Sequence, residues 1–185
     1  MRTLHAADAV RPGDGTRIAG GAVLVEGRLI AAVGPYGELA APGVRVRRWP
    51  GTIAPGAVLA DGRDFLEGAY HPDPREAGEL GTAPLTGDAL AKLAMDDARW
   101  GASARRGLQR LLARGTVRVG GAPPSRPAVR EALRRSGMGA VAPGELRAGE
   151  PATFAVFEEA ADAGSDTGPR CVATVLGGRL VHRLR

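Results

Sequence analysis

A β-hairpin pattern near each end of the chain constrains the fold most strongly. Residues 22–33 contain two apolar, partly β-branched runs joined through Gly27. Residues 171–183 repeat this plan, with Gly177-Gly178 between the two runs. Apolar runs separated by a short glycine turn are typical of antiparallel hairpins. The sequence therefore predicts that both ends of the chain contribute β-structure.

Shorter segments also have strand patterns. They are residues 3–10, 44–49, 57–60 and 116–120. Proline and glycine interrupt strands, so Pro50-Gly51 is expected to end the strand at 44–49. Pro55-Gly56 is expected to introduce the strand at 57–60, which has the composition of a buried strand.

The middle of the chain contains helical patterns. Leucine and alanine recur at helical spacing between Leu90 and Leu112, with a break expected near residues 97–101. A second helix is expected over residues 126–136, where Gly137 is a stop signal. Residues 63–85 are rich in proline, glycine and acidic side chains, which predicts a long ordered loop.

The composition narrows the class of protein. With 185 residues, 44% of them apolar, the chain can form one folded unit with an appendage. Its net charge of +5 is carried almost entirely by arginine, and no aromatic-rich basic groove accompanies it, so nucleic-acid binding is not expected. There is no signal-peptide pattern and no apolar run of the ~20 residues that span a bilayer. The single cysteine, Cys171, excludes an intrachain disulfide, and a cytoplasmic location is expected.

Several segments carry a resemblance to a known family. The hairpin at 21–34 and the stretch at 55–64 resemble the N-terminal part of amidohydrolases of the imidazolonepropionase and aminodeoxyfutalosine deaminase type. Residues 107–117 resemble the helix that precedes the second barrel strand, and residues 143–157 resemble the return from the barrel. In that group both chain ends form a small β-sandwich, the composite domain, around a TIM barrel.

The resemblance does not extend to a whole barrel. A closed α/β barrel takes ~250 residues, whereas about 90 lie between the first barrel-like strand and the return strand, which is room for two βα units. The predicted fold class is therefore α+β. Residues 1–57 and 144–185 would form the composite β-sandwich, and residues 58–143 an inserted βαβα remnant of a TIM barrel.

The resemblance also locates a candidate site. After its first barrel strand the family has two metal-binding histidines, and these positions align with Asp61 and Arg63. A catalytic divalent metal needs about three protein ligands, so no metal or other cofactor is expected. Weak candidates for a rebuilt acid–base or metal cluster are the polar residues that follow the strand, although a solvated polar loop is favoured. They are Asp61, Arg63, Asp64, Glu67 and His71.

Other chemistries find little support in the sequence. His5 and His182 lie in strand-like segments and are expected to be surface or interface side chains. Cys171 opens an apolar strand without a neighbouring histidine, so an inert, half-buried thiol is expected. The glycine-rich pieces lack phosphate-binding patterns, and no serine lies in a Gly-x-Ser-x-Gly elbow.

Three functions remain open from the sequence. The first is a catalytically inactive amidohydrolase-like protein that acts as an assembly, regulatory or partner subunit. The second is a hydrolase of non-peptide C–N bonds whose site is rebuilt or shared between subunits. The third is a small-anion binding module that uses Arg63. Because barrel remnants expose edges, a homodimer or a complex with another protein is expected. Candidate contacts are Leu90, Leu93, Leu108, Leu111, Leu112 and the edge formed by residues 57–60.

Overall fold

The structure is a computed structural model that describes residues 2–139, 144–158 and 169–184. The predicted boundary at residue 143 lies outside the described residues. The chain divides into two compact units. The sheet unit comprises Met1–Ala57, Leu112–Val117 and Val141–Arg185, and the helical unit comprises Val58–Leu111 and Arg118–Ala140.

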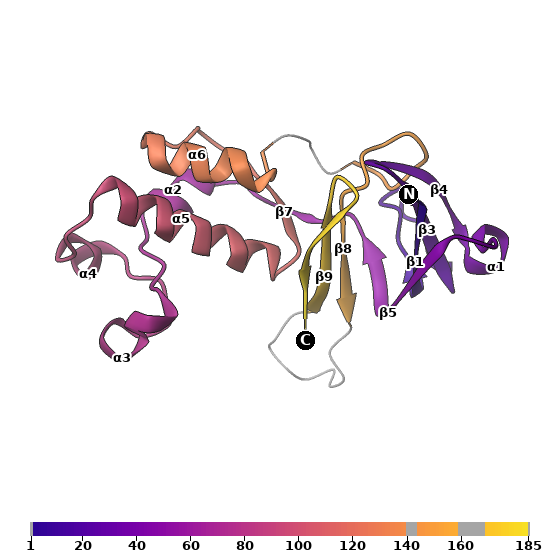
Figure 1. Ribbon diagram of the computed structural model, residues 1–185, viewed down its shortest axis with the longest axis horizontal. Coiled ribbons are helices and arrows are strands. Elements are labelled where there is room, and N and C mark those ends of the chain that lie inside the picture. Colours follow the sequence, from indigo (N-terminus) through magenta and orange to yellow (C-terminus); the bar gives the residue numbers. More distant parts are fainter. Residues whose placement is uncertain (1, 140–143, 159–168, 185) are drawn as a thin grey trace. The chain divides into compact units, whose positions relative to one another are not determined.

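The sheet unit is built on one mixed sheet of eight strands (Figure 1). Its strands are β1 (Arg2–Val10), β2 (Ile18–Ala19), β3 (Gly21–Glu26), β4 (Leu29–Pro35), β5 (Arg45–Ala54), β8 (Phe154–Glu158), β9 (Arg170–Leu176) and β10 (Arg179–Arg183), and helix α1 (Tyr36–Leu39) follows β4. The order is β10-β9-β8-β5-β1-β3-β4, and β2 pairs with β1. The β1–β5 pair is parallel, and the other pairs of this sheet are antiparallel. Both ends of the chain therefore contribute strands, and both predicted hairpins are confirmed.

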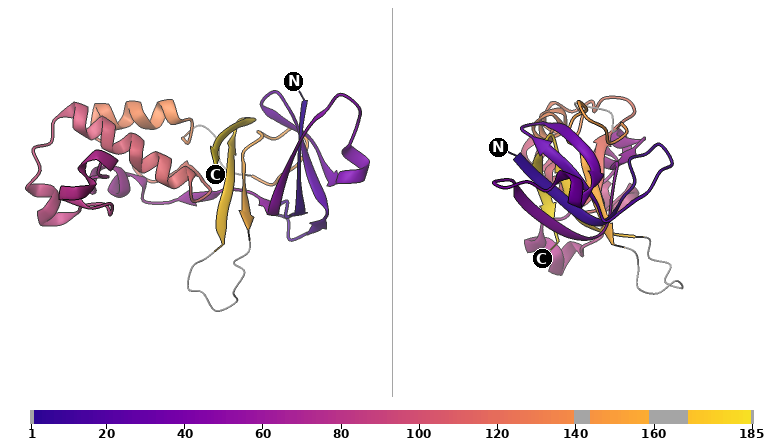
Figure 2. Two further views of the ribbon diagram at one scale, coloured as in Figure 1. Left: turned by 60° about the horizontal axis from the view of Figure 1, so that its bottom comes forward. Right: turned by 90° about the vertical axis from the view of Figure 1, so that its right-hand side faces the viewer.

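One apolar core holds this sheet together. Strands from both chain ends supply it, and among its fully buried members are Val23, Ile53, Phe154 and Val175. Burying such a side chain stabilises the fold by about 1.5–3 kcal/mol. The right-hand view of Figure 2 shows the strands wrapping around a common interior.

The segment before β8 links the two hairpins. Ala152 donates its backbone N–H to the carbonyl of Arg28, in the turn between β3 and β4, at 2.8 Å. Its own carbonyl accepts from the N–H of Gly178, in the turn between β9 and β10, also at 2.8 Å. The turn of the first hairpin is thereby connected to the turn of the last one.

Strand β5 corrects one prediction, because Pro50-Gly51 does not end it. The strand continues to Ala54 and pairs with β1 on one side and β8 on the other. Gly51 adopts a φ of +81°, and a side chain there would overlap the carbonyl oxygen of Phe157. Its N–H donates to Asp8 Oδ2 at 2.6 Å. A glycine bulge thus lets the strand bend without breaking.

The helical unit contains short helices as well as two long ones. The helices are α2 (Gly62–Glu67), the 3-10 helix η1 (Pro74–Glu76), α3 (Ala77–Leu80), α4 (Gly87–Ala91), α5 (Asp97–Leu112) and α6 (Pro127–Ser136). Figures 1 and 2 both show α5 and α6 side by side. None of the described helices is both long and apolar enough to cross a membrane.

Two predictions about this unit were wrong. Residues 63–85 are not one long loop, because α2, η1 and α3 form within them. Asp73 and Glu76 make a reciprocal capping box that starts η1, with Pro74 as its first residue. The helix break falls at residues 92–96, before α5, and not at 97–101.

Strands β6 (Ala57–Leu59) and β7 (Thr116–Val119) pair in a separate two-stranded sheet. In the chain as described, β7 is buried, whereas Val58 of β6 is 49% exposed. The prediction of a buried strand at 57–60 is therefore wrong, because no third strand of the described sheet covers β6. Leu108 and Leu111, predicted as partner contacts, are already buried within the chain. The described residues form no closed barrel.

Candidate functional site

Asp61 and Arg63 lie where β6 leads into α2. Asp61 precedes the helix and is exposed, and its side chain makes no capping hydrogen bond. Arg63 and Asp64 are in the first turn and are also exposed, and Arg63 Nε lies 3.2 Å from Glu67 Oε2. Gly62 permits this tight entry, because a Cβ at that position would overlap Cγ1 of Val119. The two positions that the resemblance aligns with metal ligands thus hold an exposed carboxylate and an arginine that is paired with Glu67.

Glu67 binds the N-terminus of α6. Its carboxylate accepts the backbone N–H groups of Ser125 at 3.0 Å and Arg126 at 2.6 Å, and the Ser125 hydroxyl at 2.8 Å. Burial acts to raise the pKa of Glu67, but these hydrogen bonds outweigh it and hold the pKa below its ordinary value. Glu67 is therefore an ionised anchor that satisfies helix-end donors.

His71 is fully buried, which corrects the prediction of a solvated loop. Its backbone N–H donates to Ser103 Oγ at 2.9 Å, and its Nε2 lies 3.0 Å from the Phe65 carbonyl oxygen. A carbonyl only accepts, so Nε2 carries the hydrogen, and Nδ1 is buried without a hydrogen-bond partner among the described residues. Burial lowers the pKa of His71, although the Phe65 carbonyl opposes this shift. The ring is therefore neutral at physiological pH.

A cluster around Tyr70 was missed by the sequence analysis. Tyr70 is buried, and its hydroxyl donates to Glu76 and accepts from Arg99 and Arg106, each at 3.3 Å. Arg99 Nη2 also lies 3.0 Å from Glu76 Oε1, and Arg106 Nε donates to the carbonyl of His71 at 2.7 Å. The two arginines are seven residues apart on α5, which puts them on one face, so this spacing was the available signal. Through these hydrogen bonds the cluster connects the segment that follows α2 with helix α5.

The five candidate residues do not form one site. Asp61, Arg63 and Asp64 are exposed at the start of α2, Glu67 caps α6, and His71 is buried beside α5. Among the described residues, no group of three or more His, Cys, Asp or Glu side chains is arranged to hold a metal ion. Arginine has no lone pair to offer a cation. The residues present therefore do not fit the metal that the resemblance to metal hydrolases implies.

His5 is buried, so the prediction of a surface or interface side chain was wrong. Its Nδ1 accepts the indole N–H of Trp49 at 3.1 Å. Burial, and secondly the charge of Arg47, lower its pKa to about 4. His182 is half-buried, and burial lowers its pKa as well. Cys171 is buried, and burial raises the pKa of its thiol, so the thiol stays protonated.

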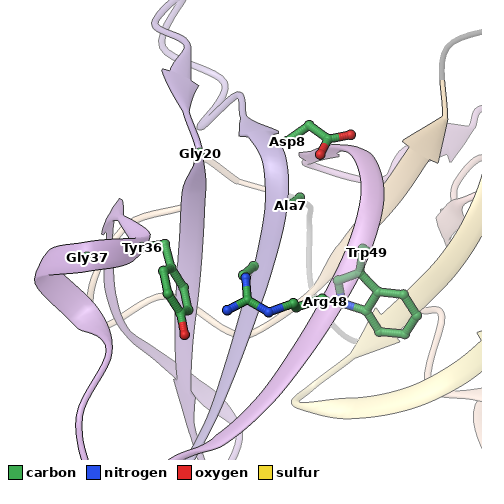
Figure 3. A pocket seen from close by; sticks show the side chains of 8 residues that line it. Ala7, Asp8, Gly20, Tyr36, Gly37, Arg48 and Trp49 are labelled. Atoms are coloured by element: carbon green, nitrogen blue, oxygen red, sulfur yellow. The ribbon is translucent and has the colours of Figure 1, made fainter.

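A shallow depression of about 420 Å³ lies on the sheet unit near Tyr36 and Arg48 (Figure 3). The Arg48 guanidinium lies 4.5 Å from the centre of the Tyr36 ring. Asp8, on the rim, accepts the N–H of Gly51. Figure 3 shows the side chains of Arg48 and Trp49 pointing to opposite sides of β5. Both charged groups of the depression already have partners, and no nucleophile lies beside a base there.

Comparison with protein families finds a match to one short segment of the chain. Residues 21–41 match the family described as the imidazolonepropionase-like composite domain of bacteria. No curated protein matches the sequence.

Some solved structures are similar to part of this chain in fold. Molinate hydrolase matches with a TM-score of 0.52 at 21% identity, over 79% of this chain and 28% of its own. Guanine deaminase of E. coli matches with a TM-score of 0.48 at 16% identity, over 73% and 34%. Aminofutalosine deaminase of Helicobacter pylori matches with a TM-score of 0.39 at 17% identity, over 65% and 27%.

The matches cover only part of the proteins compared. This chain spans about a quarter to a third of the length of the proteins it matches. At these identities the structural likeness concerns the fold alone. The predicted resemblance is confirmed at that level: in fold the chain is similar to one part of molinate hydrolase, and residues 21–41 match the imidazolonepropionase-like composite domain.

Proposed function

We propose that this chain is a catalytically inactive amidohydrolase-like protein that serves as an assembly, regulatory or partner subunit. The observation that carries the proposal is the environment of Asp61 and Arg63. Arg63 is held by Glu67, Glu67 is occupied by the N-terminus of α6, and in the described chain Asp61 is not part of a group of three or more His, Cys, Asp or Glu side chains that could hold a metal ion. The environment of these residues favours a non-catalytic surface over a hydrolytic site.

The proposal includes a finer description of the fold. The eight-stranded sheet would correspond to the composite β-sandwich, with residues 1–57 and 144–185 as its two parts. Strand β6 with α2, and β7 with α6, would correspond to two βα units of a barrel in residues 58–143. The alternation of strands and helices, together with the likeness to molinate hydrolase, supports this correspondence.

The partner role is supported by the exposure of β6. Exposed edge strands pair readily with other chains, and soluble proteins normally cover or charge them. Val58, a large apolar side chain on this strand, is 49% exposed, and Ala57 and Ala60 are exposed beside it. We therefore place the contact of a homodimer or of a complex with another protein at β6.

Light scattering of the purified chain, and of its complex from native cells, tests the partner role. Val58→Lys should dissociate the assembly and shift its dissociation constant at least tenfold. Val46→Lys is the matched control, because Val46 is 40% exposed on β5 and should leave the assembly unchanged. A monomer at micromolar concentration that captures no partner would refute the role.

Metal analysis tests the absence of catalysis separately. We expect no stoichiometric zinc, iron or nickel in protein purified without chelators. Stoichiometric metal that is lost in Asp61→Asn would overturn the proposal and favour a C–N hydrolase with a rebuilt or shared site.

A further inference from the structure

Three arginines meet at one end of the sheet unit. Arg45, Arg47 and Trp49 alternate along β5, so their side chains share the face opposite Arg48. Arg183 comes from β10, which is separated from β5 by two strands, yet its guanidinium lies 5.8 Å from the centre of the Trp49 ring. Arg183 thereby lies over the indole, on the face of β5 that also carries Arg45 and Arg47.

These arginines have no counter-charge in the described chain. The ion pairs among the described residues involve other arginines, and none joins a carboxylate to Arg45, Arg47 or Arg183. Burial lowers the pKa of Arg47, and the charges of Arg45 and Arg183 lower it further. Like charges close together and partly withdrawn from water destabilise the fold until an anion offsets them.

His5 lies beside these arginines and is neutral. It lies opposite Arg47 in the β1–β5 register, and its ring stacks on Trp49 with an interplanar angle of 14°. Because Nδ1 accepts from the indole N–H, the neutral ring carries its hydrogen on Nε2. The buried ring is neutral at physiological pH and therefore does not add to the repulsion between the guanidinium groups.

We propose that Arg45, Arg47 and Arg183, beside Trp49, form a binding site for an oxyanion, the phosphate or carboxylate group of a small ligand. Guanidinium groups present paired N–H donors whose spacing matches two oxygens of such a group. The Trp49 indole is buried and lies against the Arg183 guanidinium, so it reports on events at this site. The site lies in the sheet unit and does not depend on the proposed role of β6.

Two-dimensional NMR with inorganic phosphate and with acetate tests this site. The indole N–H of Trp49 is the reporter, and Trp100→Phe assigns it, because the chain has only two tryptophans. At ionic strength held constant with sodium chloride, one of the two anions should shift the Trp49 signal saturably. The anion that binds more tightly identifies the group as phosphate or carboxylate.

Arginine variants supply the decisive comparison. Arg183→Gln removes one charge from an exposed position and should weaken binding at least tenfold, and Arg47→Gln should do the same. Arg179→Gln is the matched control, because Arg179 is exposed at the other end of β10. The affinity of this variant for the anion should stay within twofold of that of the unchanged protein. Equal losses in Arg183→Gln and Arg179→Gln, or the absence of saturation with both anions, would overturn the proposal.

Discussion

The contacts that stabilise the sheet unit internally differ from those within the helical unit. The core of the sheet unit is a cluster of aliphatic and aromatic side chains that comes from both chain ends. The helical unit also buries apolar side chains, among them Leu66, Leu108 and Val129, and it has in addition polar side chains that reach distant backbone groups. Arg106 binds the carbonyl of His71, Arg110 the carbonyl of Thr82, and Glu67 the N–H groups that begin α6.

Because of this difference, we expect substitutions to affect the stability of the two units in different ways. Apolar burial is non-directional, so a sheet core loses stability in proportion to the volume removed. Polar contacts of the helical unit require exact positions, and a buried donor or acceptor without a partner is costly. We therefore expect truncation of a core side chain to lower the stability of the sheet unit, and small steric changes near polar contacts to lower the stability of the helical unit.

The largest effect should follow removal of a core aromatic ring from the sheet unit. Phe154 is fully buried, so Phe154→Ala should lower the free energy of unfolding by about 3–5 kcal/mol. Chemical denaturation measures this change. Val46→Ala, on the exposed side of β5, is the control and should change stability by less than about 0.5 kcal/mol. Similar losses in the two variants would contradict the core as described.

A second effect concerns pH and the buried His5. Its pKa in the folded chain is about 4 against an ordinary 6.5, so the unfolded chain takes up a proton first as the pH falls. Stability from this group is complete above pH 6.5 and is lost between pH 6.5 and 4, by about 3 kcal/mol in total.

His5→Gln isolates this contribution to the pH dependence. Glutamine retains an acceptor for the Trp49 indole but does not titrate, so the slope of unfolding free energy against pH should become shallower. His71 and His182, whose pKa values burial also lowers, are unchanged in both proteins and cancel in the difference. Parallel curves for the two proteins would show that His5 is accessible to protons in the folded state.

The third and smallest effect compares two glycines inside α5. A Cβ at Gly107 would lie 2.6 Å from His71 Nε2, whereas at Gly101 it would meet Ala128 at 3.5 Å, an ordinary contact. Gly107→Ala should destabilise the helical unit by about 1–3 kcal/mol. Gly101→Ala should be neutral or stabilising by up to about 1 kcal/mol, because alanine favours helix.

Hydrogen exchange can localise the Gly107 effect to one unit. Amides of α2 and α5 should lose protection in Gly107→Ala, while amides of β1 and β5 should keep theirs. Equal loss of protection in both units would show that they unfold together and would remove the contrast.

Much of the sheet could be predicted because its signals are local. The β3–β4 and β9–β10 hairpins follow from apolar runs around glycine turns, and both formed as expected. The continuation of β5 through Gly51 could not be predicted in this way. It depends on Asp8, 43 residues earlier, and on pairing with β8 from the other end of the chain.

The candidate site was less predictable than the fold, because burial depends on distant partners. His5 is buried through Trp49, 44 residues away, and His71 through Ser103 and α5. Their immediate neighbours in sequence give no sign of this. The Asp73–Glu76 capping box, by contrast, was a local signal within the predicted loop, and the composition of the surrounding residues concealed it.

The position of β5 has a consequence for synthesis on the ribosome. This strand pairs with β1 on one side and with β8 on the other, and about 100 residues separate it from β8. A nascent chain that has only reached α6 holds β1, β3, β4 and β5 but lacks the strands that cover the other side of β5. The sheet can therefore be completed only after translation has passed Arg183. Until then the edge of β5 that pairs with β8 is unpaired, and chaperones can bind such an edge.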